Sequence, residues 1–226
     1  MIRRMWHFPV FSSPARAGRL LCVLLTLLTA LTPVAGDEPG ARRQRLEATL
    51  NDWQSLRAGF LQTVVGEDDA VIERSRGEVS IMRPGRFRWR YEVPFSQLIV
   101  SGGAEVFIYD EDLAQVTVGT IEGTTDDPAA RLLEDRVPID ELFELAWLDP
   151  AGGLEWARLT PRAAGATYRH VDVGMRGSEL AALKLADRFG QTTIIEFEDL
   201  ERDPKLDPAR FEFDPPTGVD VVRMAE

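Results

Sequence analysis

The stretch Arg86-Phe87-Arg88-Trp89-Arg90-Tyr91-Glu92-Val93 alternates charged side chains with aromatic or aliphatic ones at every step. Successive side chains of a β-strand point to opposite faces, so this pattern predicts a strand with one apolar and one charged face. A sheet of such strands must cover its apolar face with another layer. The stretch therefore favours an antiparallel sheet with a covered inner face.

The same period of two continues on both sides of this stretch, and turn residues such as Ser101-Gly102-Gly103 and Asp110-Glu111-Asp112 separate the segments. Short connections between alternating strands indicate an antiparallel meander of roughly ten strands. The further ranges expected to form strands are 60–65, 71–82, 97–101, 104–109, 113–119, 154–160, 166–173, 179–186, 191–199 and 210–213.

Helical periodicity precedes the first of these strands. Leu46, Leu50, Trp53 and Leu56 recur at steps of four, three and three, which places them on one face of a helix. Charged residues occupy other positions of the same segment, namely Arg42, Arg43, Arg45, Glu47 and Asp52. The pattern predicts one amphipathic helix over residues 40–58.

Two short helices are expected in the middle of the chain. Asp126-Asp127-Pro128 is typical of a helix start, with an acidic cap and Pro in the first turn, and Leu132 and Leu133 follow it. The segment Val137–Leu145, which contains Leu142 and Phe143, predicts the second one.

These elements predict a mainly β protein of the α+β class. An antiparallel sheet of this length must curl or split into layers, and the helices are then available to cover its apolar inner face. The alternation fits a packed core and an enclosed cavity equally well.

Residues 1–36 are typical of a cleaved signal peptide. Four arginines precede the apolar run 20–31, and Ala35-Gly36 supplies small residues before Asp37. The run is short for a membrane span, although an uncleaved anchor is an alternative. Cys22 lies inside the run, so it does not suit lipid attachment. We expect export from the cytoplasm and a single domain over residues 37–226.

The chain is acidic, with 26 Lys and Arg against 37 Asp and Glu, for a net charge of −11. Cleavage after Gly36 would remove four arginines and no acid, which leaves a net charge of −15. Such a charge argues against binding to nucleic acid and against stable docking on anionic lipid. The single Cys excludes a disulfide framework and a cysteine-based zinc site.

Residues for catalysis are scarce. Residues 37–226 contain one histidine, His170, and neither a phosphate-binding glycine loop nor a nucleophile elbow. The carboxylate pairs Asp68-Asp69 and Asp126-Asp127 fall where turns and helix caps need them. A secreted glycoside hydrolase working through paired carboxylates is an alternative. We expect no enzymatic activity, no catalytic residue, no cofactor and no metal site.

Arginines form one basic cluster in this acidic chain. Arg86, Arg88 and Arg90 share the charged face of the opening stretch, and they favour either a solvated surface or a docking edge for an acidic partner or phospholipid headgroups. Arg83 differs because it precedes Pro84 at a strand-to-turn junction. Its guanidinium could donate to carbonyl oxygens across the mouth of the fold.

The segment Ile81–Tyr91 resembles the Arg-Pro-x-x-Phe-x-Trp signature of the periplasmic outer-membrane lipoprotein carriers, the LolA family. The resemblance extends over about residues 45–221, and the order and spacing of its pieces make it specific. The other matching segments are Phe60-Leu61-Gln62, 97–103, 109–116, 187–192 and 211–221.

The resemblance implies an unclosed antiparallel half-barrel of about 10–11 strands covered by a lid of three helices. It implies an acyl-binding concave face, and Arg83 matches the family arginine that bonds the lid when the carrier is empty. The residues expected in the lipid cavity are Leu46, Leu50, Trp53, Leu56, Phe60, Phe87, Trp89, Tyr91, Leu132, Leu133, Leu142 and Phe143.

The resemblance also implies a function. A member of the family is a monomeric periplasmic chaperone that binds the acyl chains of lipoproteins. It receives them from an inner-membrane ABC release complex and delivers them to an outer-membrane acceptor lipoprotein, without stable membrane insertion. A periplasmic module of the same fold that senses lipids or lipoproteins is the alternative.

Overall fold

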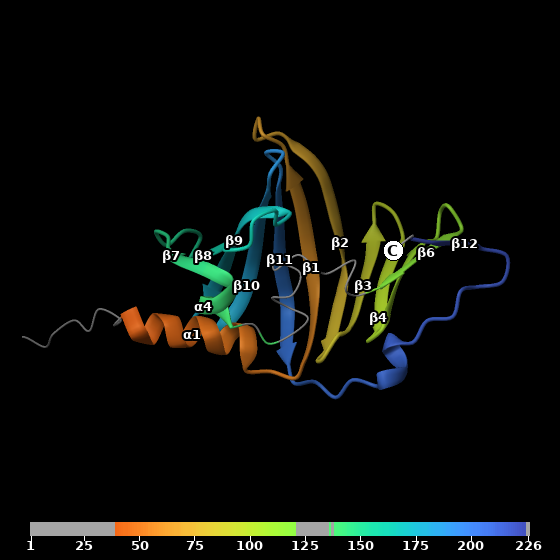
Figure 1. Cartoon of the computed structure of the whole chain (residues 1–226), viewed down its shortest axis with the longest axis horizontal. Coiled ribbons are helices and arrows are strands. Elements are labelled where there is room, and N and C mark those ends of the chain that lie inside the picture. Colours follow the sequence, from red (N-terminus) through yellow and green to blue (C-terminus); the bar gives the residue numbers. More distant parts are fainter. Residues whose placement is uncertain (1–38, 121–135, 137, 225–226) are drawn as a thin grey trace, which may run out of the picture. The chain divides into compact units, whose positions relative to one another are not determined.

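The structure is a computed structural model that describes residues 39–120, 136 and 138–224, and these residues fall in one compact unit (Figure 1). The helical elements are α1 (Pro39–Asn51), α4 (Ile139–Leu142) and the 3-10 helix η1 (Pro208–Phe211). The strands are β1 (Ser55–Val65), β2 (Val71–Met82), β3 (Arg86–Val93), β4 (Gln97–Gly102), β5 (Glu105–Asp110), β6 (Gln115–Thr120), β7 (Phe143–Trp147), β8 (Glu155–Pro161), β9 (Tyr168–Arg176), β10 (Glu179–Asp187), β11 (Thr192–Arg202) and β12 (Asp220–Arg223).

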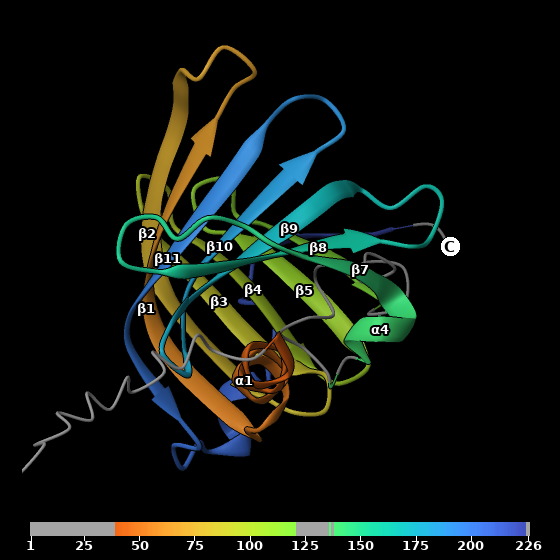
Figure 2. The same ribbon diagram turned by 90° about the vertical axis from the view of Figure 1, so that its left-hand side faces the viewer.

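All twelve strands form one sheet in the order β12-β6-β5-β4-β3-β2-β1-β11-β10-β9-β8-β7. Neighbours are antiparallel except β12, which runs parallel to β6. The terminal strands β7 and β12 do not pair with each other, so the sheet is open, and it curls around α1 (Figure 2). The predicted mainly β half-barrel is confirmed, with two strands more than the roughly ten expected from the alternation.

Strand register assigns the side chains of β3 to two faces. Trp89 lies opposite Ile99 of β4, and Ile99 lies opposite Ile108 of β5, so these three side chains share the concave face. Arg88 lies opposite Val100 of β4 on the convex face. The alternation in residues 86–93 therefore places apolar side chains on the concave face and the arginines on the convex face.

The helix α1 presents Leu46 and Leu50 to the concave face, and both are fully buried. The prediction of one helix over 40–58 is wrong at its end, because α1 stops at Asn51. Trp53 lies in the connection that follows, and Leu56 already belongs to β1. The step of three residues from Trp53 to Leu56 fits a helix. Leu56 is also the first residue of the alternating pattern Leu56-Ala58-Phe60, which is typical of a strand.

The predicted helix over Val137–Leu145 is also wrong in extent. Its helical part is the single turn α4, and Phe143 starts β7. The other predicted short helix, with Leu132 and Leu133, lies outside the described residues. The described part of the chain thus holds two α-helices and one 3-10 helix, not a lid of three α-helices.

A second apolar cluster lies on the convex face. Side chains of β4 and β6 that point away from α1 are nevertheless buried, because the chain segment with η1 and Phe213 crosses them. The strand predicted over 210–213 is wrong here: Asp207 caps the N-terminus of η1 by accepting a hydrogen bond from the backbone of Ala209. The buried residues of this cluster are Leu98, Val100, Val116, Val118 and Phe211.

Within the described ranges, no helix combines the length and apolar character needed to span a membrane.

Candidate functional site

The candidate site is the concave face where the sheet meets α1. Ten of the twelve residues predicted to line a lipid cavity lie in or against one apolar cluster there, and the other two, Leu132 and Leu133, are outside the described residues. The buried members are Leu46, Leu50, Trp53, Leu56, Phe60, Phe87 and Phe143, and the partly buried ones are Trp89, Tyr91 and Leu142.

Aromatic rings form the centre of this face. Phe60 of β1 meets Trp89 of β3 edge to face, with ring centroids 4.9 Å apart, and meets Tyr91 in the same way at 5.1 Å. Phe60 is fully buried, whereas Trp89 and Tyr91 are half-buried. Edge-to-face packing fixes the rings, and the two half-buried rings leave apolar surface available to a ligand.

Tyr91 stays uncharged at neutral pH. Its phenol donates a hydrogen bond to Oε1 of Gln62 at 3.2 Å. Burial, with a smaller contribution from Glu73, raises the pKa of Tyr91 to about 12. The polar end of this side chain therefore adds no charge to the concave face.

Sequence reasoning missed much of this face, although it could have been found in the alternation of the strands already identified. The missing residues come from β4, β5 and the strands from β7 to β11. The additional apolar residues packed in or against the cluster include Ile99, Ile108, Leu145, Trp147, Leu159, Val171, Val173, Met175, Leu183, Leu185, Ile195 and Phe197.

Arg83 fastens the C-terminal end of α1. Its Nη2 donates to the carbonyl oxygen of Leu50 at 2.8 Å, and Nη1 lies 3.4 Å from the carbonyl oxygen of Trp53. Its guanidinium carbon is 3.4 Å from the centroid of the Trp53 ring. The last carbonyl groups of a helix lack intrahelical donors and carry partial negative charge, so a cation is favourable there. The predicted contacts with carbonyl oxygens are confirmed.

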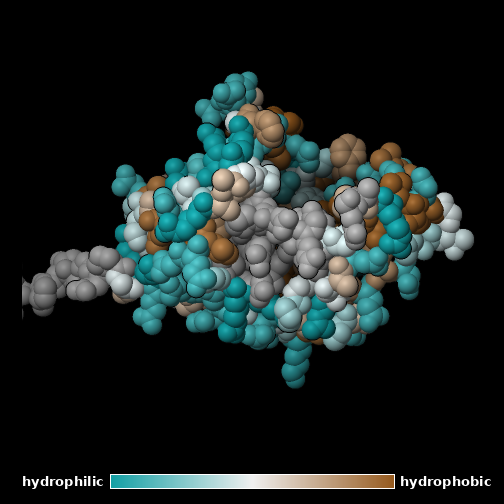
Figure 3. Space-filling model, viewed as in Figure 1, coloured by the Kyte–Doolittle hydropathy of each residue, from teal (hydrophilic) through white to brown (hydrophobic). Residues whose placement is uncertain are grey.

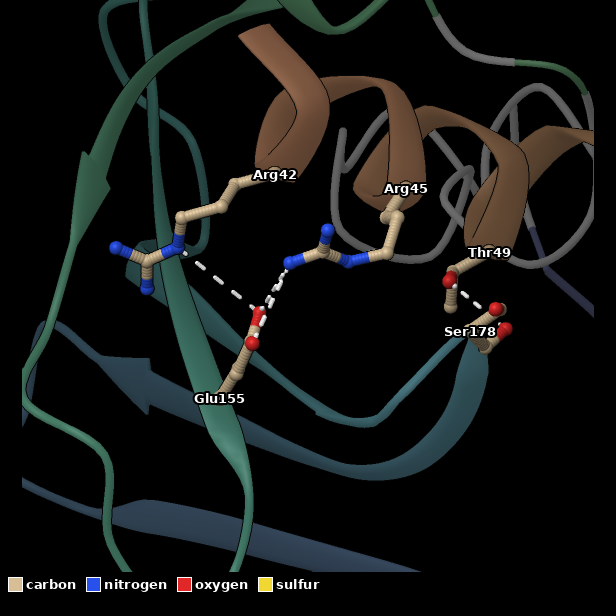
Figure 4. Close-up of polar contacts among 5 residues, drawn as sticks. All are labelled: Arg42, Arg45, Thr49, Glu155 and Ser178. Carbon is tan, nitrogen blue, oxygen red and sulfur yellow. Dashed lines mark hydrogen bonds and ion pairs between the residues drawn. The ribbon is translucent and has the colours of Figure 1, made fainter. Parts of the chain in front are cut away.

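Other polar contacts hold the preceding turns of α1 (Figure 4). Nη2 of Arg45 lies 3.2 Å from Oε2 of Glu155 on β8, and Nε of Arg42 lies 3.9 Å from the same atom. Oγ1 of Thr49 donates to the carbonyl oxygen of Ser178 at 3.0 Å. These polar contacts join α1 to β8 and to the turn between β9 and β10, and they add to the apolar packing of Leu46 and Leu50 against the sheet.

Among the described residues, an ion pair joins α1 to α4. Arg43 pairs with Asp140 of α4, and it also pairs with Glu47 one turn along α1. The hydrogen bond from Arg43 lowers the pKa of Asp140. Both side chains are exposed, so we regard the pair as an orienting contact and not as a large source of stability.

The hairpin loops farthest from Arg83 expose apolar side chains. The connections β1–β2, β3–β4, β5–β6 and β10–β11 share this end of the sheet because the strands alternate in direction. We call it the hairpin end; brown residues stand out near the tip of β1–β2 and above β4 and β6 in Figure 3. The exposed apolar residues near these connections are Val71, Ile72, Val93, Phe95, Leu113 and Phe189.

The described ranges, residues 39–120, 136 and 138–224, contain a single histidine, His170. No group of His, Cys, Asp and Glu side chains there has an arrangement that could hold a metal ion. His170 is partly buried on β9, and its pKa is lowered by burial and by the nearby Arg158. The apolar and aromatic side chains of the concave face are suited to holding an apolar ligand.

A family model described as "Outer membrane lipoprotein carrier protein LolA" matches residues 51–214. An outer-membrane lipoprotein carrier protein of Bordetella avium is 37% identical over 197 residues, covering 87% of this chain and 94% of its own length. The protein of the same name from Methylibium petroleiphilum is 41% identical over 198 residues, covering 86% of this chain and 96% of its own length.

Solved structures also resemble this fold. A LolA superfamily protein from Nitrosomonas europaea aligns with a TM-score of 0.47 and 10% identity, covering 75% of this chain and 95% of that one. An uncharacterized conserved protein from Thermus thermophilus aligns with a TM-score of 0.49 and 14% identity, covering 82% of this chain and 99% of that one.

Proposed function

The chain belongs to the outer membrane lipoprotein carrier family, LolA, and on that premise we propose that it binds the acyl chains of lipoproteins against its concave face and carries them across the periplasm. The observation that carries the proposal is the apolar concave face closed by a separately fastened helix. Leu46 and Leu50 of α1 cover the sheet, and polar contacts with Arg83, Glu155 and Ser178 hold α1 in that position.

The acyl chains would take the place that α1 now occupies against the sheet. In the structure, Leu46, Leu50 and Phe60 are all within 1% of complete burial, which describes the closed arrangement. Moving α1 outward would expose these side chains together with Trp89 and Tyr91. We propose that the predicted cavity residues line the acyl site in this opened arrangement. The contacts of Arg83 with the C-terminal end of α1 oppose the opening.

Reversible binding of acyl chains requires a free energy that opposes binding, and a helix that closes over the acyl site can supply it. Burial of an acyl chain gains about 0.8 kcal/mol per methylene group. Several full-length chains would gain more than about 20 kcal/mol, the limit for reversible association. A carrier that must release its cargo therefore needs an opposing free energy. Breaking the contacts of α1 and uncovering its apolar face supply that free energy here.

We place this activity in the periplasm, with residues 1–36 as the export signal and residues 37–226 as the carrier domain. The proposed donor is an inner-membrane ABC release complex, and the proposed acceptor is an outer-membrane lipoprotein. The hairpin end offers exposed apolar side chains beside acidic loops such as Glu67-Asp68-Asp69 and Asp110-Glu111-Asp112, which a partner surface could cover. We propose that the carrier is monomeric and catalyses no reaction.

The direct test is release of lipoprotein from a membrane. Inner-membrane vesicles that contain labelled lipoproteins and their release machinery are incubated with ATP and the purified chain, then sedimented. We expect label in the supernatant in a one-to-one complex with the chain, because the concave face shields the acyl groups from water. Label that remains in the pellet at every concentration of the chain would overturn the proposal.

Trp89→Ala should weaken acyl binding by about tenfold, because it removes half-buried apolar surface from the concave face. The matched control is Val100→Ala, on the neighbouring strand but on the convex face. Both variants should be less stable, but the control should keep the affinity of the wild type. Fluorescent fatty-acid titration measures the affinity; equal weakening by both variants would contradict the placement of the site.

The alternative of a lipid-sensing module gains no specific support. The two carriers described above match this chain over 94% and 96% of their own lengths, and their names describe transport. A hydrolase would need carboxylates that project into a polar cleft, whereas β3 directs Phe87, Trp89 and Tyr91 to the concave face. The carrier is therefore the function we propose.

A further inference from the structure

The convex face carries a pocket that the carrier function does not use. It has a volume of about 390 Å³ and lies between β2, β3 and the segment around η1, seen as a short blue helix beside the lower end of β4 in Figure 1. We call it the arginine pocket. Its lining residues are Glu78, Ser80, Arg88, Arg90, Ala209, Arg210 and Glu212.

Two of its three arginines have acidic partners. Arg90 pairs with Glu111 at 3.1 Å. Arg210 lies 3.5 Å from Oε2 of Glu78, and its Nε donates to Oγ of Ser80 at 3.1 Å. These contacts hold Arg90 and Arg210 in fixed positions at the wall of the pocket.

The third arginine of the pocket, Arg88, differs from Arg90 and Arg210. Among the residues that the structure describes, no carboxylate lies within ion-pair distance of its guanidinium, which is partly buried. Burial lowers the pKa of Arg88, and the like charges of Arg210 and Arg90 lower it further. A partly desolvated cation next to two others is stabilised when an anion enters between them.

We propose that the arginine pocket binds a phosphate group, either as inorganic phosphate or as the headgroup phosphate of a phospholipid. A guanidinium presents a planar fork of donors that fits the oxygens of a phosphate, and charge-assisted hydrogen bonds of this kind are strong. The volume is ample for a tetrahedral oxyanion with water. The lining holds three arginines against two glutamates, Glu78 and Glu212, so it has one net positive charge in a chain whose net charge is −11.

The arginine pocket and the acyl site can be occupied independently. Arg88 and Arg90 alternate along β3 with Trp89 and Tyr91, so the two sites lie on opposite faces of the same strand. A change at Arg88 should therefore alter phosphate binding and leave acyl binding unchanged. This difference separates a failure of the present inference from a failure of the carrier function.

The test is a calorimetric titration of the purified chain with inorganic phosphate at constant ionic strength set with chloride. We expect saturable binding by the wild type and at least about tenfold weaker binding by Arg88→Gln, from the loss of charge-assisted hydrogen bonds. Arg88→Lys should be intermediate, because it keeps the charge without the fork. The matched control is Arg86→Gln, on the same face of β3 but outside the pocket lining.

A vesicle experiment distinguishes the two sources of phosphate. If a lipid headgroup is the ligand, phosphatidylglycerol vesicles should recruit the wild type and Arg86→Gln but not Arg88→Gln in a flotation assay. If free phosphate is the ligand, vesicles should leave all three in solution while the titration still separates them. Equal phosphate and vesicle binding by Arg88→Gln and the wild type, or no preference for phosphate over chloride, would overturn the inference.

Discussion

Arg83→Leu should bind acyl ligands about ten- to a hundredfold more tightly than the wild type and should transfer lipoprotein to an acceptor membrane far more slowly. The variant loses the hydrogen bond from Nη2 to the carbonyl oxygen of Leu50 and the stacking on Trp53. Both contacts exist only while α1 lies against the sheet. Their loss therefore destabilises the closed arrangement, while the acyl-site residues other than Trp53 keep their contacts.

The magnitude follows from the strength of these contacts. A hydrogen bond from a charged group contributes about 1.5–3 kcal/mol, and about 1.4 kcal/mol corresponds to a tenfold change in affinity. When the open arrangement is a minor population, the apparent affinity rises in proportion to the open fraction. Tighter binding and slower release are then two results of one change, because the closing free energy that expels the cargo has been reduced.

The measurements are fatty-acid affinity and the rate at which labelled lipoprotein passes from the loaded chain to vesicles containing the acceptor. Arg86→Leu is the matched control, since it removes an arginine three positions away on β3 that has no contact with α1 among those described here. Circular dichroism of both variants is the check that each is folded. Wild-type affinity together with wild-type transfer by Arg83→Leu would show that Arg83 does not oppose opening.

The alternation in β3 was enough to predict the face on which Phe87, Trp89 and Tyr91 lie. That prediction is reliable because the alternation of side chains follows from the backbone of the strand itself and does not depend on the neighbouring strands. The contact between Arg83 and the carbonyl groups was also foreseen, because Pro84 marks the end of a strand. Only the family resemblance, in which the matching arginine bonds the lid, indicated that these carbonyl groups would belong to a helix.

Predictions failed where tertiary packing decides the outcome. β4 is covered on both sides, and the segment around Phe211 that covers its convex side lies more than a hundred residues away in the sequence. The four-residue strand β12 pairs in parallel with β6, and no local pattern specifies such a pairing. The arginine pocket was missed for the same reason, because Arg210 reaches β3 only through this distant segment.

Replacement of Gly77 by alanine should strongly destabilise the sheet beneath both sites. A Cβ at Gly77 would lie 1.8 Å from the carbonyl oxygen of Arg90 and 3.0 Å from the Cα of Tyr91. These are backbone atoms of β3, so no side-chain rotation can relieve the overlap. The strands β2 and β3 would have to separate where a register shift between Arg76 and Gly77 already interrupts their ladder.

We expect Gly77→Ala to lower the free energy of unfolding by about 3 kcal/mol or more, at the upper end of the usual range for overpacking. In a chain of this size, that corresponds to a fall of about 10 °C in the melting temperature. Thermal and guanidinium unfolding followed by circular dichroism measure the change. Acyl binding should weaken as well, because a displaced β3 carries Trp89 and Tyr91 away from Phe60.

Gly59→Ala provides the comparison that identifies the cause. Gly59 lies on β1, next to β2, and a Cβ there would meet Cβ of Glu198 at 3.6 Å, an ordinary contact. Its effect should stay within about 1 kcal/mol, since alanine also reduces the conformational freedom of the unfolded chain. If both variants unfold alike, loss of a flexible glycine explains the result. A large effect confined to Gly77→Ala attributes it to the close approach of β2 and β3, and thus to the strand that separates the acyl site from the arginine pocket.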